Sequence, residues 1–222
     1  MKDLKLIATE DGSHTLYRED IDENYHSSHG AIQEAEHVFI QSGLAPLVGS
    51  KNLLTILEMG FGTGLNALLT ANYAHLVKQQ IHYIGLEAFP VDTDLIKQLN
   101  YPELVGGMSD KHFTKVHEAK WGGIGVVNNF LTIQKIEQKL EDFIPRKGID
   151  LVYYDAFGPN AQAEVWDINL FDKLFNYMNS NSVLVTYCAK GQVRRDLESV
   201  GFTVERLEGP PGKREMLRAT KK

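Results

Sequence analysis

The sequence predicts an α/β fold in which helices cover both faces of a parallel β-sheet. Short apolar runs typical of buried strands occur at residues 53–59, 81–87, 150–155 and 183–187, and stretches with leucines at helical spacing lie between them. A glycine-rich stretch follows directly after the first of these runs. Because strands alternate with helices along the chain, the strands are expected to run parallel.

Length and composition are those of an ordinary globular protein. The chain has 222 residues, of which 43% are hydrophobic and 23% charged, which favours one domain with additions and excludes a disordered, collagenous or fibrous protein. The longest apolar runs, 53–57 and 183–185, are far shorter than the roughly 18 residues that span a bilayer. No apolar signal sequence follows Met1. We therefore expect a cytoplasmic protein with no membrane association.

Cysteine and histidine content limits the metal and disulfide chemistry. Cys188 is the single cysteine, which excludes an intramolecular disulfide and a cysteine-rich zinc site, and we expect it to pack in the core. His26 and His29 are close in sequence, but no third ligand accompanies them. No metal site is expected.

The chain is expected to have two parts. Residues 1–50 form an N-terminal appendage that packs near the site, with a helix at 31–42 that ends before Gly43 and Pro46. Residues 51–222 form the main domain. Its helices are indicated by Leu65, Leu68, Leu69 and Leu76, and by Leu170, Leu174 and Met178.

Two stretches interrupt the alternation. Residues 88–129 contain two prolines and two glycine pairs, are too long for a simple crossover, and are expected to be an inserted lid or substrate loop. Residues 201–207 and 213–219 flank Gly209-Pro210-Pro211-Gly212 and are expected to be two strands joined by a turn.

The glycine-rich stretch indicates a ligand site. Gly60, Gly62 and Gly64 lie between a strand and a helix, where glycines keep side chains away from a ligand at the carboxyl end of the strand. The same stretch formally matches a dinucleotide-binding pattern, and Glu87 stands where an acid would bind a ribose. Glu58 at the mouth of the loop would oppose a pyrophosphate but tolerate the ammonium group of S-adenosylmethionine. We therefore favour S-adenosylmethionine as the cofactor.

A second motif follows the third predicted strand. Asp155 stands at the carboxyl end of that strand and is followed by Phe157 and Pro159. A carboxylate there can orient an amine and accept its proton, and the carbonyls of Ala156 or Phe157 can hold the second hydrogen. Alternatively, Asp155 caps the next turn. Trp166 either stacks on a flat base or packs in the core.

These motifs, taken together, carry a resemblance to a family. The stretch from Glu58 to Asn66, the Asp155–Pro159 motif with Glu164 and Trp166, and two C-terminal motifs around Arg195 and Lys213 resemble the methyltransferase part of the bifunctional tRNA-modifying MnmC proteins and their stand-alone MnmD relatives. The resemblance extends from about residue 25 to 217.

The resemblance implies a fold and a reaction. The fold is a Rossmann-like class I methyltransferase with a seven-stranded, mostly parallel sheet whose last strand is reversed. The reaction transfers a methyl group from S-adenosylmethionine to the aminomethyl nitrogen on carbon 5 of the wobble uridine of tRNA. Leu65 and Asn66 would join the glycines, Glu58 and Glu87 in binding the cofactor, while Tyr25, Glu34, Phe157, Pro159 and Trp166 would line the substrate side and Asp155 would be catalytic.

The sequence departs from the family pattern at three points. Ala163 stands where the family usually has a proline, so that loop is expected to be less rigid. Glu137 is assigned to the adenine side of the cofactor in place of a Gly-Asp pair. The flavin-dependent oxidase part of MnmC has no room in this chain, so a separate oxidase is expected to supply the aminomethyl substrate.

Charge distribution is compatible with an RNA partner. Residues 186–222 carry a net charge of +4, whereas the remaining 185 residues carry −10. Basic residues there either bind tRNA phosphates or form salt bridges with Glu198 and Glu215. These residues are Arg194, Arg195, Lys213 and Arg214.

Three other functions stay open at this point. A polyamine aminopropyltransferase would use the same sheet and an acidic pocket. A nicotinamide-dependent oxidoreductase is favoured by the formal glycine pattern and opposed by Glu58. A catalytically silent RNA-binding module would bind the cofactor without turnover.

Overall fold

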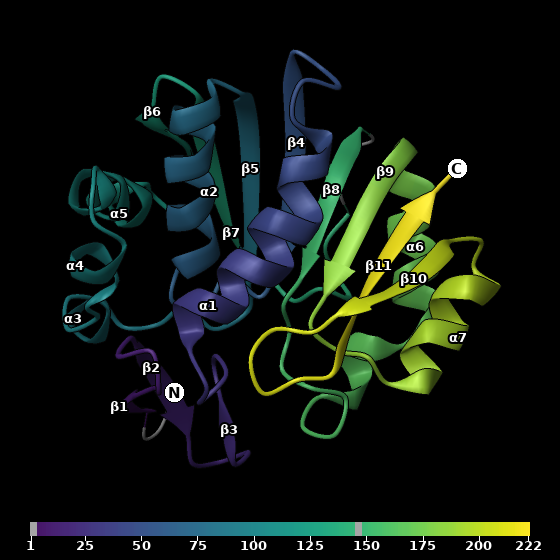
Figure 1. Cartoon of the computed structure of the whole chain (residues 1–222), viewed down its shortest axis with the longest axis horizontal. Helices are drawn as coiled ribbons and strands as arrows, with labels where there is room; N and C mark the ends of the chain where they lie inside the picture. The colour runs from purple at the N-terminus through teal and green to yellow at the C-terminus, as the bar shows by residue number, and fades with distance from the viewer. Residues whose placement is uncertain (1–3, 145–147) are drawn as a thin grey trace.

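A computed structural model describes residues 4–144 and 148–222, and within them the strands form two sheets. The main sheet has the order β10-β11-β9-β8-β4-β5-β7-β6 (Figure 1). Its centre is five parallel strands: β7 (Leu131–Glu137), β5 (Gln80–Glu87), β4 (Leu53–Met59), β8 (Ile149–Tyr154) and β9 (Met178–Thr186). The strands expected at 53–59, 81–87, 150–155 and 183–187 are therefore present.

The two edges of the main sheet contain the antiparallel strands. β11 (Glu215–Lys221) runs antiparallel to β9 and pairs with β10 (Thr203–Glu208), so the reversed last strand is confirmed. At the other edge, β6 (Ile124–Asn128) pairs antiparallel with β7. In the described residues this sheet thus has eight strands rather than the expected seven. The sequence did not reveal β6 because its apolar residues Ile124 and Val126 are 67% and 68% exposed and a glycine separates them.

Helices cover both faces of the sheet, as the α/β prediction requires. One face carries α1 (Ala31–Ala35), its π-helical continuation η1 (Glu36–Leu44), α2 (Leu65–Val77) and α5 (Ser109–Glu118) (Figure 1). The other face carries α6 (Ile168–Tyr177) and α7 (Gly191–Ser199). Short helical segments connect these elements: η2 (Ala45–Leu47), α3 (Thr93–Ile96), α4 (Tyr101–Val105) and η3 (Ala163–Trp166).

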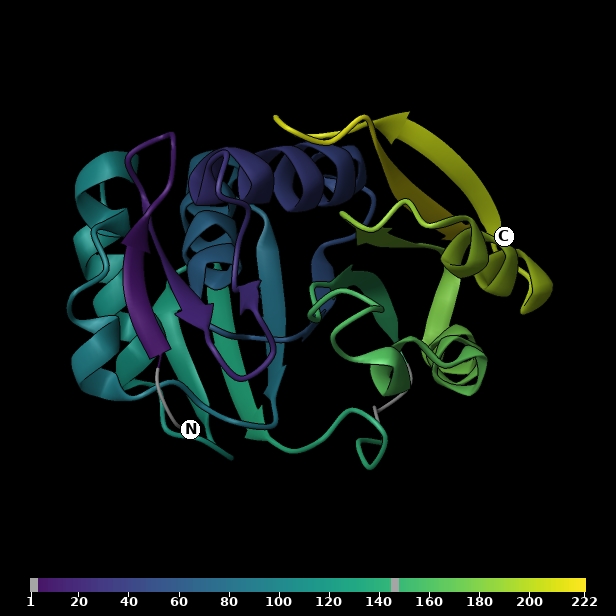
Figure 2. The same ribbon diagram turned by 90° about the horizontal axis from the view of Figure 1, so that it is seen from below.

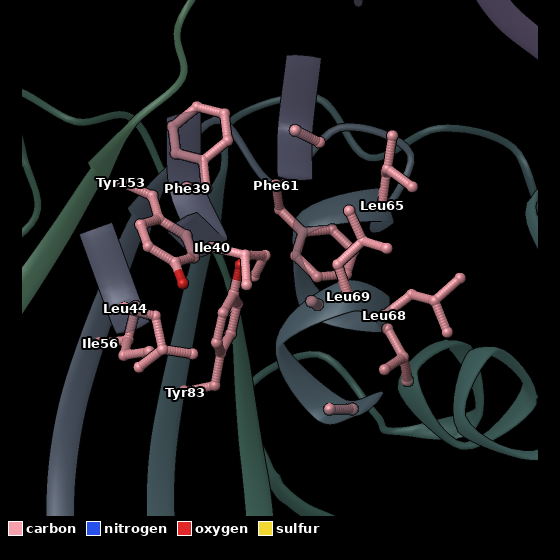
Figure 3. Packing of buried hydrophobic residues seen from close by; sticks show 14 of the residues in the cluster. Phe39, Ile40, Leu44, Ile56, Phe61, Leu65, Leu68, Leu69, Tyr83 and Tyr153 are labelled. Atoms are coloured by element: carbon pink, nitrogen blue, oxygen red, sulfur yellow. The ribbon is translucent and has the colours of Figure 1, made fainter. Parts of the chain in front are cut away.

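Alternation along the central strands divides the core into two layers. On β8, Leu151 and Tyr153 face α1 and η1, whereas Val152 and Tyr154 face α6. Figure 3 shows the first layer, where Tyr83 and Tyr153 of the sheet pack beside Phe39 and Leu44 of η1. Full burial of both strand faces explains why the sequence reads as continuous apolar runs.

The first 50 residues do not form one appendage. β1 (Leu4–Ala8), β2 (His14–Arg18) and β3 (Glu23–Asn24) form a small antiparallel sheet beyond the carboxyl ends of the parallel strands (Figures 1 and 2). Residues 31–44, by contrast, belong to the main core, where Val38 and Leu44 are fully buried. Residues 1–3 of the expected appendage lie outside the described residues.

Two further expectations need correction. The segment 88–129 is not a loop: it contains α3, α4, α5 and β6, and α5 packs against α2 and β6. Met178 begins β9 instead of ending the preceding helix. Among the described helices, none has the length and apolarity needed to span a bilayer.

Candidate active site

A cavity of about 750 Å³ lies at the carboxyl ends of the parallel strands, where open α/β sheets bind their ligands. The loops after β4, β5, β7, β8 and β9 form its walls, and residues 18–29 of the N-terminal segment cover part of it. From the segment once expected to be a lid, Ala88 and Phe89 alone among the described lining residues contribute.

The glycine loop forms the wall after β4. Gly60 and Gly62 line the cavity with φ angles of 92° and 51°, a region that disfavours side chains. A Cβ atom on Gly60 would lie 2.6 Å from the carbonyl oxygen of Asp155. Gly64, at the start of α2, faces His117 and is not among the lining residues. Gly60 therefore lets the loops after β4 and β8 come into contact.

Glu87 lies at the end of β5 and lines the cavity. Its two carboxylate oxygens accept hydrogen bonds from the backbone N–H groups of Gly62 and Phe89, each at 2.9 Å. Burial raises its pKa, and these backbone hydrogen bonds act in the opposite direction. Glu87 thus orders the glycine loop, and each of its oxygens keeps lone-pair capacity for a ligand hydroxyl.

Glu58 and Asp155 are joined through one amide. The Asn66 Nδ2 atom donates to Glu58 Oε1 at 2.9 Å and to Asp155 Oδ2 at 2.8 Å. Asp155, Asn66 and the adjacent Leu65 line the cavity, whereas Glu58 is 1% exposed and lies behind Asn66. Contrary to expectation, Glu58 therefore does not form part of the described cavity wall.

Both carboxyl groups of this cluster titrate abnormally. Burial raises the pKa of Asp155 to about 7, and the nearby Glu34 carboxylate adds to the increase, while the Asn66 hydrogen bond and the Lys213 ammonium oppose it. Burial also raises the pKa of Glu58 well above its usual range. The cavity wall thus carries a carboxyl group that exchanges a proton near neutral pH.

The opposite wall is aromatic and contains an ion pair. Tyr25 meets Phe157 edge to face, with ring centroids 5.0 Å apart. Lys213, from the loop after β10, pairs with the buried carboxylate of Glu34 and lies 3.9 Å from the centroid of the Tyr187 ring. These five residues and Pro159 line the cavity. The structure therefore brings the expected residues Tyr25, Glu34, Phe157, Pro159 and Lys213 together.

Trp166 has a different position from the one expected. Its indole is 5% exposed, packs against Tyr154 and Phe171, and is not among the described lining residues. The indole Nε1 donates to the carbonyl oxygen of Phe157 at 2.7 Å, and the Tyr187 hydroxyl donates to that of Ala156 at 2.8 Å. Both carbonyls proposed to hold an amine hydrogen thus already accept hydrogen bonds.

Four other expected site residues lie away from the cavity. Glu137 is exposed at the end of β7, and the cavity wall there consists of residues 138–141. Arg194 forms a salt bridge with Glu198 at 2.8 Å, and Arg195 donates to Gln192 at 2.8 Å. Arg214 lines a shallower groove beside the cavity, together with Lys190 and Lys213. Glu215 pairs with Arg206, not with Arg214.

Sequence reasoning missed several cavity residues. Tyr187 and Lys190 follow β9, and their position at the carboxyl end of a predicted strand was the available signal. Arg18, which lies 5.3 Å from the Phe157 ring centroid, gave no such signal because the small N-terminal sheet was not predicted. His26 is half-buried and hydrogen-bonded to Thr15, and no group of three or more metal-ligating side chains occurs among the described residues.

The cavity suits a nucleoside cofactor with a positively charged centre. Gly60 and Gly62 allow close approach to the backbone, and Glu87 is available for ribose hydroxyls. The Asn66 Oδ1 atom is buried without a hydrogen-bond partner among the described residues, as an acceptor awaiting an ammonium hydrogen would be. S-adenosylmethionine, which has an ammonium group and no phosphate, fits this set of groups.

Comparisons with known proteins agree with this fit. Residues 119–222 match the family model described as S-adenosyl-L-methionine-dependent methyltransferase. The tRNA 5-methylaminomethyl-2-thiouridine biosynthesis bifunctional proteins MnmC of Pseudoalteromonas atlantica and Cupriavidus necator are 30% and 31% identical, each over 88% of this chain. The chain spans about a third of their length, 30% and 31% respectively.

Solved structures support the same fold. The crystal structure of MNMC2 from Aquifex aeolicus aligns with a TM-score of 0.81 and 22% identity, covering 100% of this chain and 71% of that one. Spermidine synthase from Thermotoga maritima aligns with a TM-score of 0.55 and 10% identity, over 99% of this chain and 72% of that one.

The fold and site define an S-adenosylmethionine-dependent methyltransferase with a Rossmann-like sheet. This assignment replaces the nicotinamide-dependent alternative. More narrowly, the chain is an MnmC-like methyltransferase domain, homologous to MnmC proteins over nearly its full length.

Proposed function

We propose that the chain transfers a methyl group from S-adenosylmethionine to the aminomethyl nitrogen on carbon 5 of a tRNA wobble uridine, giving the 5-methylaminomethyl group. The observation that carries the proposal is Asp155, a cavity-wall carboxyl group with a pKa of about 7. The similarity to proteins named for 5-methylaminomethyl-2-thiouridine biosynthesis supports this choice of acceptor. An oxidase is the proposed source of the aminomethyl group.

Separate groups of residues bind the cofactor and accept the proton. Gly60, Gly62, Leu65, Asn66 and Glu87 bind the cofactor, which supplies an electrophilic methyl group on a sulfonium centre. Asp155 accepts the proton that the aminomethyl ammonium must lose before its lone pair can attack.

Aromatic rings of the cavity orient the acceptor base. They are the edge-to-face pair of Tyr25 and Phe157 and the ring of Tyr187. Hydrogen bonds to the carbonyls of Ala156 and Phe157 fix the loop that carries Asp155. A rigid loop keeps the reacting nitrogen in line with the methyl group.

The groove beside the cavity supports an RNA acceptor. Lys190, Lys213 and Arg214 line it, and Lys190 and Lys213 also line the cavity. We assign to Lys190 and Arg214 the phosphates next to the target nucleotide. The ion pairs of Arg194 with Glu198 and of Arg206 with Glu215 make these two arginines less suited to that role.

One observation favours a second candidate, alkylation of a small polyamine. Among the described lining residues, acids outnumber lysines and arginines by seven to four, and an acidic cavity suits a polycation. The acids are Asp22, Glu23, Glu34, Glu87, Glu141, Asp155 and Glu164, and the bases are Arg18, Lys139, Lys190 and Lys213.

Transfer of labelled methyl from S-adenosylmethionine separates the two candidates. The acceptors are tRNA from cells that accumulate the aminomethyl intermediate, fully modified tRNA as the matched negative control, and putrescine or spermidine. Label in 5-methylaminomethyl-2-thiouridine after nucleoside digestion supports the proposal. Label in the polyamine, with none in tRNA, overturns it, and so does transfer of the aminopropyl group from decarboxylated S-adenosylmethionine to putrescine, a reaction that leaves the methyl group on methylthioadenosine.

A further inference from the structure

We propose that Asn66 is a positioning residue that fixes the Asp155 carboxylate and lets it ionise before Glu58 does. The inference deepens the proposed function and rests on it for the catalytic role of Asp155. Its structural basis is the amide bridge between two carboxyl groups on neighbouring strands of the sheet.

The geometry of the bridge uses the full donor capacity of one nitrogen. An amide NH₂ group has two hydrogens, and Asn66 directs one to Glu58 Oε1 and the other to Asp155 Oδ2. Asn66 itself is 3% exposed in the first turn of α2, so packing holds its orientation. Asn66 thus offers the Asp155 carboxylate a hydrogen-bond donor whose position is fixed. The bridge therefore orients this carboxylate.

The surroundings of the two carboxyl groups differ. Glu58 is 1% exposed and its Oε2 atom has no hydrogen-bond partner among the described residues, whereas Asp155 lines the cavity. Two carboxyl groups that share one donor, one buried and the other half-buried, do not ionise together without a large cost. The more deeply buried Glu58 therefore keeps its proton. Asp155 ionises instead, and the hydrogen bond from Asn66 stabilises its negative charge.

Other charged and titratable groups act on this pair from the surrounding elements. Glu34 on α1 raises the pKa of Asp155, and Lys213 from the loop after β10 lowers it. Removal of the Asn66 donor shifts the balance toward protonated Asp155. The remaining groups that face the pair are Tyr83 on β5, Glu87 at its end, Tyr153 on β8, and Tyr187 after β9; Glu36 faces Tyr153 from η1.

Asn66→Asp removes the amide donor and keeps the shape of the side chain, but the carboxyl group that it adds also raises the pKa of Asp155, so the uncharged Asn66→Ser isolates the loss of the amide donor. We expect the acid limb of the single-turnover pH–rate profile to move up by about one unit or more, and the rate at pH 7 to fall about tenfold or more. Asn66→Ser, a smaller change, is the second variant and is expected to shift the limb in the same direction. Asn72→Asp is the matched control, since Asn72 lies on the same helix and bonds to Ser109 and His112 instead.

A direct titration separates this inference from the proposed function. Selective ¹³C labelling of aspartate carboxyl groups, with Asp155→Asn for assignment, gives the Asp155 midpoint by NMR without any methyl acceptor. An upward shift in Asn66→Asp or Asn66→Ser, absent in Asn72→Asp, supports the inference even if tRNA is not methylated. An unchanged midpoint in a folded variant overturns it, and it does so equally when cofactor binding is weaker, because Asn66 then acts on the cofactor and not on the Asp155 carboxylate.

Discussion

Two aspartates lie at opposite ends of β8, and their environments differ. Asp150, near the start of the strand, is 6% exposed and accepts hydrogen bonds from the Lys51 ammonium, from Thr55 N at 2.9 Å and from Asn179 Nδ2 at 2.6 Å. Asp155, directly after the strand, receives one neutral side-chain donor, Asn66, among the described residues. The same residue type is therefore fully hydrogen-bonded at one end of the strand and sparsely hydrogen-bonded at the other.

This difference separates a structural carboxylate from a reactive one. A buried carboxylate with a cation and two further donors has its charge compensated and holds β4, β8 and β9 together. Asp155 instead lies near the negative charge of Glu34, and burial raises its pKa to about 7. The carboxyl group proposed to accept the proton thus lacks the compensating cation that Asp150 has in Lys51.

The largest predicted effect is the loss of methyl transfer when Asp155, at the carboxyl end of β8, is replaced. Asp155→Asn keeps an acceptor for Asn66 but cannot take a proton, so the single-turnover rate should fall by a factor of about 10²–10⁴. Cofactor affinity, measured by calorimetry, should change by no more than about threefold. A rate close to that of the unchanged protein would remove Asp155 from the mechanism.

The pH dependence of the methyl-transfer rate tests the role of Asp155 in the unchanged protein. Asp155 must be ionised to accept a proton, so the rate should rise with pH, about tenfold per unit below its pKa of about 7, and level off above it. Single-turnover measurements between pH 5 and 9 give this limb. A flat profile over that range would contradict the assignment of Asp155 as proton acceptor.

Stability measurements compare the two ends directly. Asp150→Ala leaves the Thr55 N–H and the Asn179 amide without their acceptor and should destabilise the protein by about 2 kcal/mol. Loss of the ion pair adds little to this value because the partly exposed Lys51 ammonium can be hydrated instead. Asp155→Asn should stabilise it at pH 8. The folded-state pKa of Asp155 lies above its unfolded value, so stability is lost as pH rises toward about 7, and the variant removes that loss.

Thermal unfolding at pH 5 and pH 8 gives both comparisons. The gain from Asp155→Asn should be larger at pH 8, while the loss from Asp150→Ala should persist at both values. Methyl transfer by Asp150→Ala below its melting temperature should stay near normal. Equal destabilisation by the two variants at pH 8 would remove the distinction between the two ends.

Much of this arrangement could be predicted from the sequence. Buried strands appear as apolar runs, and ligand-binding loops follow their carboxyl ends. The sequence therefore predicts the place of Asp155, Glu87, Gly60 and Gly62 in the cavity wall. Strand β6 was missed because two of its three apolar residues, Ile124 and Val126, are exposed, and Val127 alone gives no periodic burial signal.

Other site features depended on contacts that the sequence does not show. Lys213 was expected either to bind phosphate or to form a salt bridge with Glu198 or Glu215, and it pairs instead with Glu34, which lies 179 residues away along the chain. For Trp166 the sequence allows either a stacking surface for a base or a core residue. Its packing against Tyr154 and Phe171 makes it a core residue. Such choices depend on tertiary packing rather than on local pattern.

The smallest predicted effect concerns the loop that carries Asp155. Trp166→Phe keeps an aromatic ring against Tyr154 and Phe171 but removes the Nε1 donor to the Phe157 carbonyl oxygen. Loss of one such hydrogen bond costs about 1 kcal/mol, so the methyl-transfer rate should fall a few-fold, and the KM for the acceptor should rise more than that for the cofactor. Phe171→Leu, which alters the same packing but leaves the indole N–H in place, is the matched control. If both variants lowered the rate equally, packing alone would account for the order of this loop, and the hydrogen bond to Phe157 would have no separate role in positioning Asp155.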